Sequence, residues 1–346
     1  MSESGTYRAE HELAGRHVLI TGASSGIGRA AALAVSKKGA VVFLIARRED
    51  QLATVVAEIR AAGGRAHGYP CDITDTASVE ATLKELLDEH ERVDMLVNNA
   101  GRSIRRAIHR STDRLHDYER TMAVNYFGAL RLTLALLPQM RERGFGHIVN
   151  ISSAGVQVAT PRYSAYLASK AALDKFAEVA AVETMADGVG FTTIHMPLVR
   201  TPMIAPSGDQ GRAESPEWAA ATIVRALTER PRRIDVPIGT LGEFGAIFAP
   251  RLRDLVLHRY YRMIPDSPAA RGEQNGSTTD LPSVTALTDS ESPDEVTAVV
   301  HHIDDHRPPS PTRSRRAPLP RAGARVARGT GTALRRAARW VPGTHW

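Results

Sequence analysis

The sequence predicts an α/β fold, a parallel and doubly wound sheet of about seven strands with helices on both faces. Short apolar runs alternate with helix-forming stretches from His17 to Val236, and repeated units of this kind build parallel sheets. The runs are unbroken, for example Ala40 to Ala46, as expected of strands that are buried on both faces. Glycine-rich and polar residues follow several runs, and ligands bind at such strand ends.

The first unit predicts a dinucleotide site. Its strand, His17 to Ile20, runs into a turn of Gly-x-x-x-Gly-x-Gly spacing, and an alanine-rich helix follows from Arg29. Glycines let the backbone approach a pyrophosphate, and a helix N-terminus offers free N–H groups. An ordinary glycine-rich turn is the alternative. The predicted cofactor-binding residues of this turn are Gly22, Ser24, Ser25, Gly26, Ile27 and Gly28.

The second strand, 40–46, ends at Arg47 and Arg48. A site for NAD carries an acidic residue about 20 residues after the glycines, where it holds the ribose 2′-hydroxyl. Two guanidinium groups instead suit a 2′-phosphate, which they bind through charge-assisted hydrogen bonds. We therefore expect NADP(H) to be preferred over NAD(H). A solvated charge pair at a strand end is the alternative.

The remaining elements continue the alternation. Strands are predicted at 65–70, 93–97, 147–151, 191–195 and 233–236, and helices at 51–62, 77–90, 118–143 and after the N-cap Ser215. Residues that follow two of these strands are also expected to bind the cofactor. They are Asp72, Ile73, Asn99, Ala100 and Gly101.

Tyr166 and Lys170 are expected to carry the chemistry. They lie four residues apart at the start of a stretch rich in helix formers, so a helix would place them on one face. A positive charge beside a phenol favours ionisation, so the pair can exchange a proton with an alcohol or carbonyl oxygen. On its own, the spacing is more typical of a surface helix with an exposed lysine and a half-buried tyrosine.

Together these motifs resemble the classical short-chain dehydrogenase/reductase family. The matching residues are Thr21-Gly22-x-x-x-Gly26-x-Gly28, Asn98-Asn99-Ala100-Gly101, Asn125, Ser153 and Tyr166-x-x-x-Lys170, over about residues 14–236. The resemblance implies a Rossmann-type fold with Tyr166 as the general acid/base. It implies that Lys170 lowers the pKa of Tyr166 and holds the nicotinamide ribose, that Ser153 orients the substrate oxygen, and that Asn125 anchors a water in the proton relay.

The same resemblance extends the cofactor site to the loop after strand 191–195. It adds Pro197, Val199 and Thr201, the last as a contact of the carboxamide. Leu198 departs from the family pattern, in which a glycine usually follows the proline. No metal site is expected.

The implied function is that of an NADP(H)-dependent oxidoreductase, which transfers hydride between nicotinamide and a carbonyl or alcohol carbon. The alternatives are a reductase of small or cyclic ketones and alcohols, a non-catalytic NADP(H)-binding regulator, and a scaffold that acts through the tail. Because Tyr166 and Lys170 are both present, catalysis is favoured over the regulator.

Residues 238–267 are predicted to form a helical extension that Pro250 splits in two. Leu241, Phe244 and Phe248 fall near one helical face. The segment resembles the C-terminal part of bacterial fatty acyl-CoA reductase-type members of the family. That resemblance implies a lipophilic substrate, namely a long-chain aldehyde, an acyl-CoA or a ketoacyl compound, with the loop 203–212 as its cover. A helix pair that packs on the body or on a dimer partner is the alternative.

The single cysteine, Cys71, excludes an internal disulfide framework and suits a reducing compartment. The first 14 residues are expected to form a flexible arm before a catalytic domain at 15–237, and they lack the apolar core of a signal peptide. No apolar run reaches the ~18 residues that cross a bilayer. We expect a cytoplasmic protein that forms a homodimer or homotetramer and that can associate with a membrane.

Residues 268–346 are expected to be disordered, because Ser, Thr, Pro and Arg dominate and apolar periodicity disappears. Residues 271–305 hold one Arg and eight acids, whereas 306–346 hold ten Arg and no acid. The excess of positive charge therefore belongs to the tail, and no specific binding of nucleic acid is expected. The Arg-rich end is expected to contact anionic membranes weakly or to fold back on the acidic segment.

Overall fold

The computed structural model describes residues 13–204, 213–264, 266 and 270. Three sequence-based expectations therefore lie largely outside the described residues. They are the flexible arm over 1–14, the substrate cover over 203–212 and the disordered tail over 268–346.

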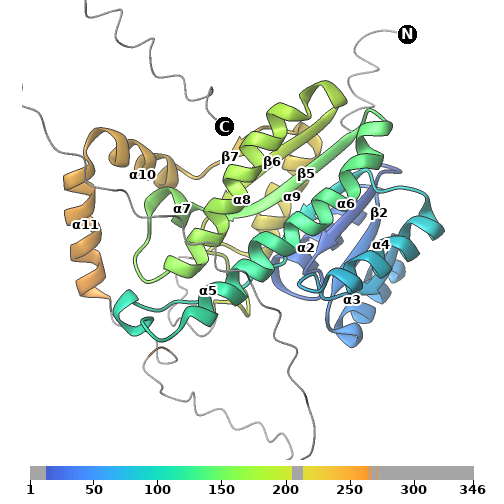
Figure 1. Cartoon of the computed structure of the whole chain (residues 1–346). Helices are drawn as coiled ribbons and strands as arrows, with labels where there is room; N and C mark the ends of the chain where they lie inside the picture. The colour runs from blue at the N-terminus through green and yellow to red at the C-terminus, as the bar shows by residue number, and fades with distance from the viewer. Residues whose placement is uncertain (1–12, 205–212, 265, 267–269, 271–346) are drawn as a thin grey trace, which may run out of the picture. The chain divides into compact units, whose positions relative to one another are not determined.

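Within the described residues, seven parallel strands form one sheet in the order β3-β2-β1-β4-β5-β6-β7 (Figure 1). The strands are β1 (His17–Thr21), β2 (Val41–Ala46), β3 (Arg65–Pro70), β4 (Met95–Asn98), β5 (Gly146–Ser153), β6 (Val189–Met196) and β7 (Arg233–Ile234). The chain order reverses between β1 and β4, so the carboxyl ends of these two strands open a crevice in which ligands of such sheets bind. The predicted α/β fold is confirmed.

Helices cover both faces of the sheet. They are α2 (Gly26–Ser36), α3 (Glu49–Ala61), α4 (Thr76–His90), α5 (Leu115–Met122), α6 (Ala129–Glu142), α7 (Ala154–Val158), α8 (Ser164–Glu183), α9 (Pro216–Glu229), α10 (Pro237–Phe248) and α11 (Pro250–Met263), with short turns η1 (Ile108–Arg110), η2 (Ala123–Gly128) and η3 (Met185–Asp187). One core cluster joins the sheet to α2, α3 and α9, and the other joins it to α4, α6 and α8. The unbroken apolar strands are buried because both faces are covered.

The predicted helix over 118–143 is not one regular α-helix. It consists of α5, a π-helical turn η2 and α6. The short α7 is an addition that the sequence did not predict, and β7 is shorter than the predicted strand at 233–236. By contrast, Ser215 caps α9 as predicted, because its side chain accepts a hydrogen bond from the backbone N–H of Trp218.

The predicted division of the C-terminal helix pair at Pro250 is confirmed. Helix α10 packs on α7 and α11 packs on α10 (Figure 1). Arginine side chains fasten α11 to the segment between α7 and α8. Arg162 donates to the carbonyls of Tyr261 (3.2 Å) and Ile264 (2.6 Å), and Arg253 donates to the carbonyl of Val158 (3.0 Å).

Among the described helices, none is both long and apolar enough to cross a bilayer.

Candidate active site

The glycine-rich turn after β1 is shaped by close packing. Gly22 (φ +66°) and Gly26 (φ +55°) adopt the left-handed conformation that other residues avoid. At Gly28, a Cβ atom would lie 2.3 Å from the carbonyl oxygen of Gly22 and 2.6 Å from Asn99 Nδ2. Only glycine lets the start of α2 approach so closely, and the glycine spacing of the sequence is explained by this geometry.

The N-terminus of α2 faces this turn without a side-chain cap. Ser25 occupies the N-cap position, but its hydroxyl accepts no hydrogen bond from the first turn of the helix. The first N–H groups of a helix have no partner within the helix, and the helix dipole favours negative charge there. The turn therefore fits a pyrophosphate, with Gly26, Ile27 and Gly28 supplying the amides.

Thr21 ties the turn to the end of β4, a role that the sequence did not predict. Its Oγ1 accepts hydrogen bonds from the backbone N–H groups of Asn99 (3.0 Å) and Ala100 (2.8 Å). The Asn99 side chain returns a hydrogen bond to the Thr21 carbonyl (2.8 Å). The Asn99-Ala100-Gly101 segment is thereby held beside the glycine-rich turn, where the crevice of the sheet opens.

Arg47 and Arg48 lie exposed at the end of β2, beside the same turn. The Arg48 guanidinium reaches the hydroxyls of Ser24 (3.5 Å) and Ser25 (3.4 Å). Both contacts are long, so the guanidinium is held weakly and its donors remain available. Guanidinium and hydroxyl groups placed in this way can donate to a group that carries several acceptor oxygens.

Asp72 and Ile73 follow β3 at the neighbouring strand end. Thr74 donates two hydrogen bonds to Asp72 Oδ1, from its backbone N–H (2.9 Å) and from its hydroxyl (2.8 Å). Burial raises the pKa of Asp72, but these hydrogen bonds and the charge of Arg47 outweigh it and lower that pKa below its usual value. The carboxylate is therefore fixed by Thr74, and its charged form is favoured.

Asn125 lies buried in the π-helical turn η2. Its Nδ2 donates to Ser169 Oγ (2.8 Å) and to the Arg102 carbonyl (2.9 Å), and its Oδ1 accepts from the Arg102 N–H (2.7 Å). A Cβ atom on Gly101 would lie 3.2 Å from Asn125 Oδ1 and 3.6 Å from Lys170 Nζ. The structure therefore brings Asn125, Gly101 and Lys170 together, with Ser169 as a partner that the sequence did not predict.

Ser153 ends β5, and its hydroxyl caps α7 by accepting from the N–H of Gly155 (3.1 Å). Burial raises the pKa of Tyr166 to about 12, and a hydrogen bond with Ser153 opposes this rise. Burial dominates this net rise, and the expected effect of Lys170 on the pKa of Tyr166 stays a prediction. The Lys170 ammonium group donates to the Ile151 carbonyl (2.7 Å). At neutral pH the phenol keeps its proton and is able to donate it.

Lys170 is 3% exposed. Burial lowers its pKa to about 8, and the negative charge of Asp174 opposes that shift. An ammonium group with this pKa is mostly protonated at neutral pH, and it can release a proton within the range in which most enzymes work.

The loop after β6 approaches the glycine-rich turn. A Cβ atom on Gly26 would lie 3.2 Å from Thr201 Cγ2, so this part of the loop lies over the start of α2. Val199 is buried and pairs with Glu214 in an isolated bridge. Pro197 begins the loop and Leu198, which departs from the family pattern, is half exposed.

The described residues also place one group of possible metal ligands together, although the sequence predicted none. His67, Glu89 and His90 offer ligand atoms that lie within 4.8 Å of one another. Tyr69 shares this cluster, because its hydroxyl contacts Glu89 (2.8 Å) and His90 (3.0 Å). The cluster joins β3 to the end of α4, whereas the residues around Tyr166 belong to η2, β5 and α8.

Comparison with known proteins agrees with this geometry. The profile of the short chain dehydrogenase family matches residues 16–211. An uncharacterized oxidoreductase of Mycobacterium tuberculosis is 47% identical over 270 residues, which are 77% of this chain and 79% of that protein. A protein named fatty acyl-CoA reductase, from Acinetobacter baylyi, is 47% identical over 262 residues, which are 75% of this chain and 89% of that protein.

A solved structure shares the architecture. The crystal structure of a short-chain dehydrogenase from Streptomyces avermitilis superimposes with a TM-score of 0.61 at 34% identity. The match covers 72% of this chain and 99% of that one. The chain therefore belongs to the short-chain dehydrogenase family, and it is an NAD(P)-dependent oxidoreductase.

Proposed function

We propose that the protein is an NADP(H)-dependent oxidoreductase in which Tyr166 exchanges a proton with a carbonyl or alcohol oxygen. The convergence of Ser153, Tyr166, Lys170 and Asn125 at the end of β5, beside the glycine-rich turn, carries this proposal. A bound nicotinamide supplies or accepts the hydride. Ser153 orients the substrate oxygen, Tyr166 donates its proton during reduction, and Lys170 and Asn125 hold the path by which that proton is replaced.

Turnover with NADPH tests this proposal, measured against aldehydes, ketones and acyl-CoAs of graded chain length. Tyr166→Phe removes the proton donor and keeps the ring, so activity should fall by at least the ~10²–10⁴-fold typical of general acid–base catalysis. Binding of NADPH, followed by its fluorescence, should stay near the wild-type level. Turnover of Tyr166→Phe at the wild-type rate would contradict the assignment.

Preference for NADP(H) over NAD(H) rests on Arg47, Arg48 and the two serines that Arg48 contacts. Changing both arginines to Ala should weaken NADPH binding by ~2–3 kcal/mol, the scale of hydrogen bonds to charged groups. Binding of NADH should hardly change, because NADH lacks the 2′-phosphate. Equal weakening of the two cofactors would mean that these arginines do not contact the phosphate.

The proposed substrate is lipophilic: a long-chain aldehyde, an acyl-CoA or a ketoacyl compound. The name of the relative from Acinetobacter baylyi supports an acyl-CoA, since the match spans 89% of that protein. A cavity of about 400 Å³ at the α7–α8 turn also supports it, because Val156, Ala159, Pro161 and Leu167 give the lining an apolar character. Tyr166 itself does not line this cavity, so an acyl chain would extend into it from the reacting carbon.

The C-terminal helix pair gives less support than the sequence suggested. Leu241, Phe244 and Phe248 lie on the face of α10 opposite to Gly239, which is buried against Gln157 of α7. Their side chains are more than half exposed, so they do not form a closed channel wall in the described part of the chain. If catalytic efficiency stays flat as the acyl chain lengthens, the alternative of a small or cyclic substrate is favoured.

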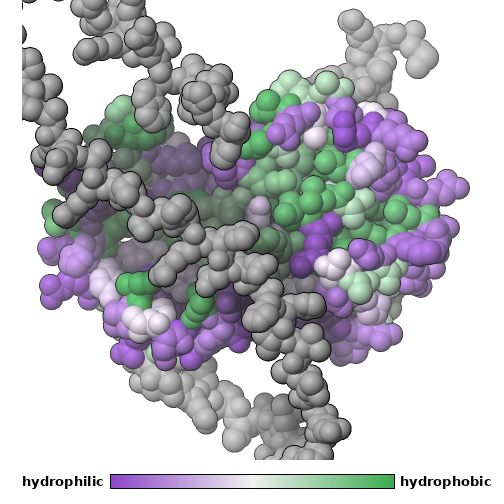
Figure 2. Space-filling view, viewed as in Figure 1, coloured by the Kyte–Doolittle hydropathy of each residue, from purple (hydrophilic) through white to green (hydrophobic). Residues whose placement is uncertain are grey.

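We further propose a cytoplasmic homodimer or homotetramer. Figure 2 shows apolar surface over this side of the body, where α6 and α8 lie. Exposed apolar side chains on α6 and on the second half of α8 support self-association through these helices. They are Leu134, Val179 and Val182. Contact with a membrane through the Arg-rich end stays a prediction, because residues 306–346 lie outside the described part of the chain. Sedimentation of the protein in solution measures the oligomer directly.

A further inference from the structure

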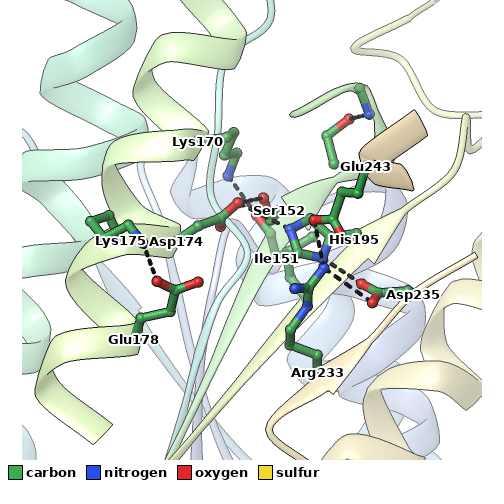
Figure 3. A network of polar contacts seen from close by, with 12 residues as sticks. Ile151, Ser152, Lys170, Asp174, Lys175, Glu178, His195, Arg233, Asp235 and Glu243 are labelled. Atoms are coloured by element: carbon green, nitrogen blue, oxygen red, sulfur yellow. Dashed lines mark hydrogen bonds and ion pairs between the residues drawn. The ribbon is translucent and has the colours of Figure 1, made fainter. Parts of the chain in front are cut away.

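A buried histidine lies behind the catalytic helix, between two carboxylates (Figure 3). His195, on β6, is 5% exposed. Its Nε2 lies 3.1 Å from Asp174 Oδ2 and its Nδ1 lies 2.7 Å from Asp235 Oδ1. Burial lowers the pKa of His195, but the two carboxylates outweigh burial and raise that pKa above its usual value. The two carboxylates therefore favour the protonated form of the imidazole.

Asp174 connects His195 to the proposed active site. It follows Lys170 by one turn of α8, and its Oδ2 also accepts a hydrogen bond from Ser152 Oγ (2.8 Å). Ser152 directly precedes Ser153, and Lys170 donates to the carbonyl of Ile151 in the same strand. The same aspartate therefore contacts the strand of the proposed catalytic serine and lies on the helix of Tyr166 and Lys170.

The second oxygen of Asp174 is more unusual. Within the described residues, Oδ1 is buried and accepts no hydrogen bond. An unsatisfied buried oxygen of a charged group costs free energy, which a purely structural ion pair would be expected to avoid. Because the charge of Asp174 raises the pKa of Lys170, the open oxygen is better explained as part of an electrostatic counter-charge to that ammonium group.

Charges continue from His195 toward the C-terminal helices. Asp235 also lies 3.1 Å from Arg233, and Arg233 lies 2.8 Å from Glu243 of α10. Figure 3 shows this alternating row, from Glu243 through His195 to Asp174. Asp174 acts on both Lys170 and Tyr166, and Tyr163 also acts on Tyr166. His195 on β6 faces Asp174, with Asp235 and then Arg233 beyond it.

We propose that Asp174, held in place by His195, is a positioning residue that keeps Lys170 charged and Ser153 aligned from behind the active site. The proposal rests on the proposed function, because it assigns Asp174 a role in the same proton exchange. Asp174 itself contacts neither the substrate nor the cofactor.

Asp174→Asn is the test, because it keeps the shape and the acceptor for Ser152 while it removes the charge. The charge of Asp174 raises the pKa of both Lys170 and Tyr166, so its loss lowers both. The alkaline limb of the pH profile of kcat/KM for reduction should therefore move to lower pH by about 1–3 units, the effect of a charge at close range. The pH dependence of NADPH affinity, measured by fluorescence, should move in the same direction.

Asp235→Asn is the matched control. It removes the carboxylate on the other side of His195 and contacts neither Ser152 nor Lys170, so the alkaline limb should stay in place. If Asp174→Asn lowers the rate by the same factor at every pH, the proposal is overturned. The contact between His195 and Asp174 would then be a structural ion pair without a role in the proton exchange. If Asp174→Asn does not fold, Asp174→Glu decides: its displaced charge should move the limb in part, and lost rate without a shift overturns the proposal.

The proposed function fails in a different way. A wild-type protein that binds NADPH but reduces no carbonyl compound would contradict the function. The binding curves of wild type and Asp174→Asn would still differ in their pH dependence if Asp174 keeps Lys170 charged, and curves that coincide would overturn the inference.

Discussion

Helices α8 and α10 carry similar apolar patterns and lie in opposite surroundings. On α8, Leu173 is 1% exposed and Ala177 is 3% exposed, because the helix packs on the sheet. On α10, Leu241 is 71% exposed and Phe248 is 76% exposed, because only the other face of the helix packs on α7. Apolar residues at helical spacing therefore predict a helix and its apolar face, but they do not predict what covers that face.

The two regions are also held together differently. The sheet and α8 are joined by buried apolar side chains, whose removal from water is the main stabilising contribution. Helix α11 is joined to the body by arginines, chiefly Arg162, which stacks on Tyr261 at 4.5 Å, pairs with Asp266 and reaches the carbonyls at the end of α11. The body should therefore respond most to lost volume, and α11 should respond most to lost hydrogen bonds.

The largest expected effect tests the buried region. Leu173→Ala leaves a cavity where a side chain of α8 was buried and should lower the free energy of unfolding by ~2–5 kcal/mol. Phe248→Asp is the matched change on the exposed helix and should alter stability by less than about 0.5 kcal/mol. Urea unfolding of both variants gives the two values. A large loss in Phe248→Asp would mean that another surface covers α10 in solution.

An intermediate effect is expected where the two regions meet. Arg162→Ala removes the donors to the carbonyls of Tyr261 and Ile264, and each hydrogen bond to a charged group contributes ~1.5–3 kcal/mol. Amide hydrogen exchange in α11 should become faster, while exchange in β5 and α8 stays slow. Arg110→Ala, which removes the exposed partner of Asp266, is the control and should have a smaller effect. Faster exchange throughout the sheet would show that the pair is part of the core.

The smallest expected effect concerns a charge in the buried region. In the folded protein the pKa of Lys170 lies at about 8, below its usual value of 10.5, so the unfolded chain binds more protons between these values. Stability of the cofactor-free protein should therefore rise with pH in this window, by about 2 kcal/mol between about pH 8 and pH 10. Unfolding of wild type and Lys170→Met across this range isolates the contribution. Parallel curves for the two proteins would contradict the lowered pKa.

Much of the fold and of the candidate site was predictable from local signals. Unbroken apolar runs fixed the strands, and Gly22, Gly26 and Gly28 stood where positive φ or close approach requires glycine. The family motifs located Ser153, Tyr166 and Lys170 because their spacing is itself the signal. The structure brings these residues together, while their roles stay predictions.

The remaining features depend on contacts between residues far apart in the chain. Thr21 meets Asn99 across neighbouring strands, and His195 meets Asp174 across 21 residues, so no local spacing reports either contact. The net rise in the pKa of Tyr166 was not predicted, because neighbouring charge was considered and burial was not. Asp174 lies one turn after Lys170 on α8, and this spacing is a local signal that the two side chains share a face of the helix.

The π-helical turn η2 changes the helical phase between α5 and α6. A π-turn holds one more residue than an α-turn, so α5 and α6 belong to one continuous helix but are out of phase with each other. A single helical wheel over 118–143 cannot describe both. Deleting one residue from 123–128 would convert the turn to an α-turn and rotate α5 by about 100° relative to α6. The inserted residue therefore acts as a phase shift between the two helices, at the turn from which Asn125 reaches Ser169.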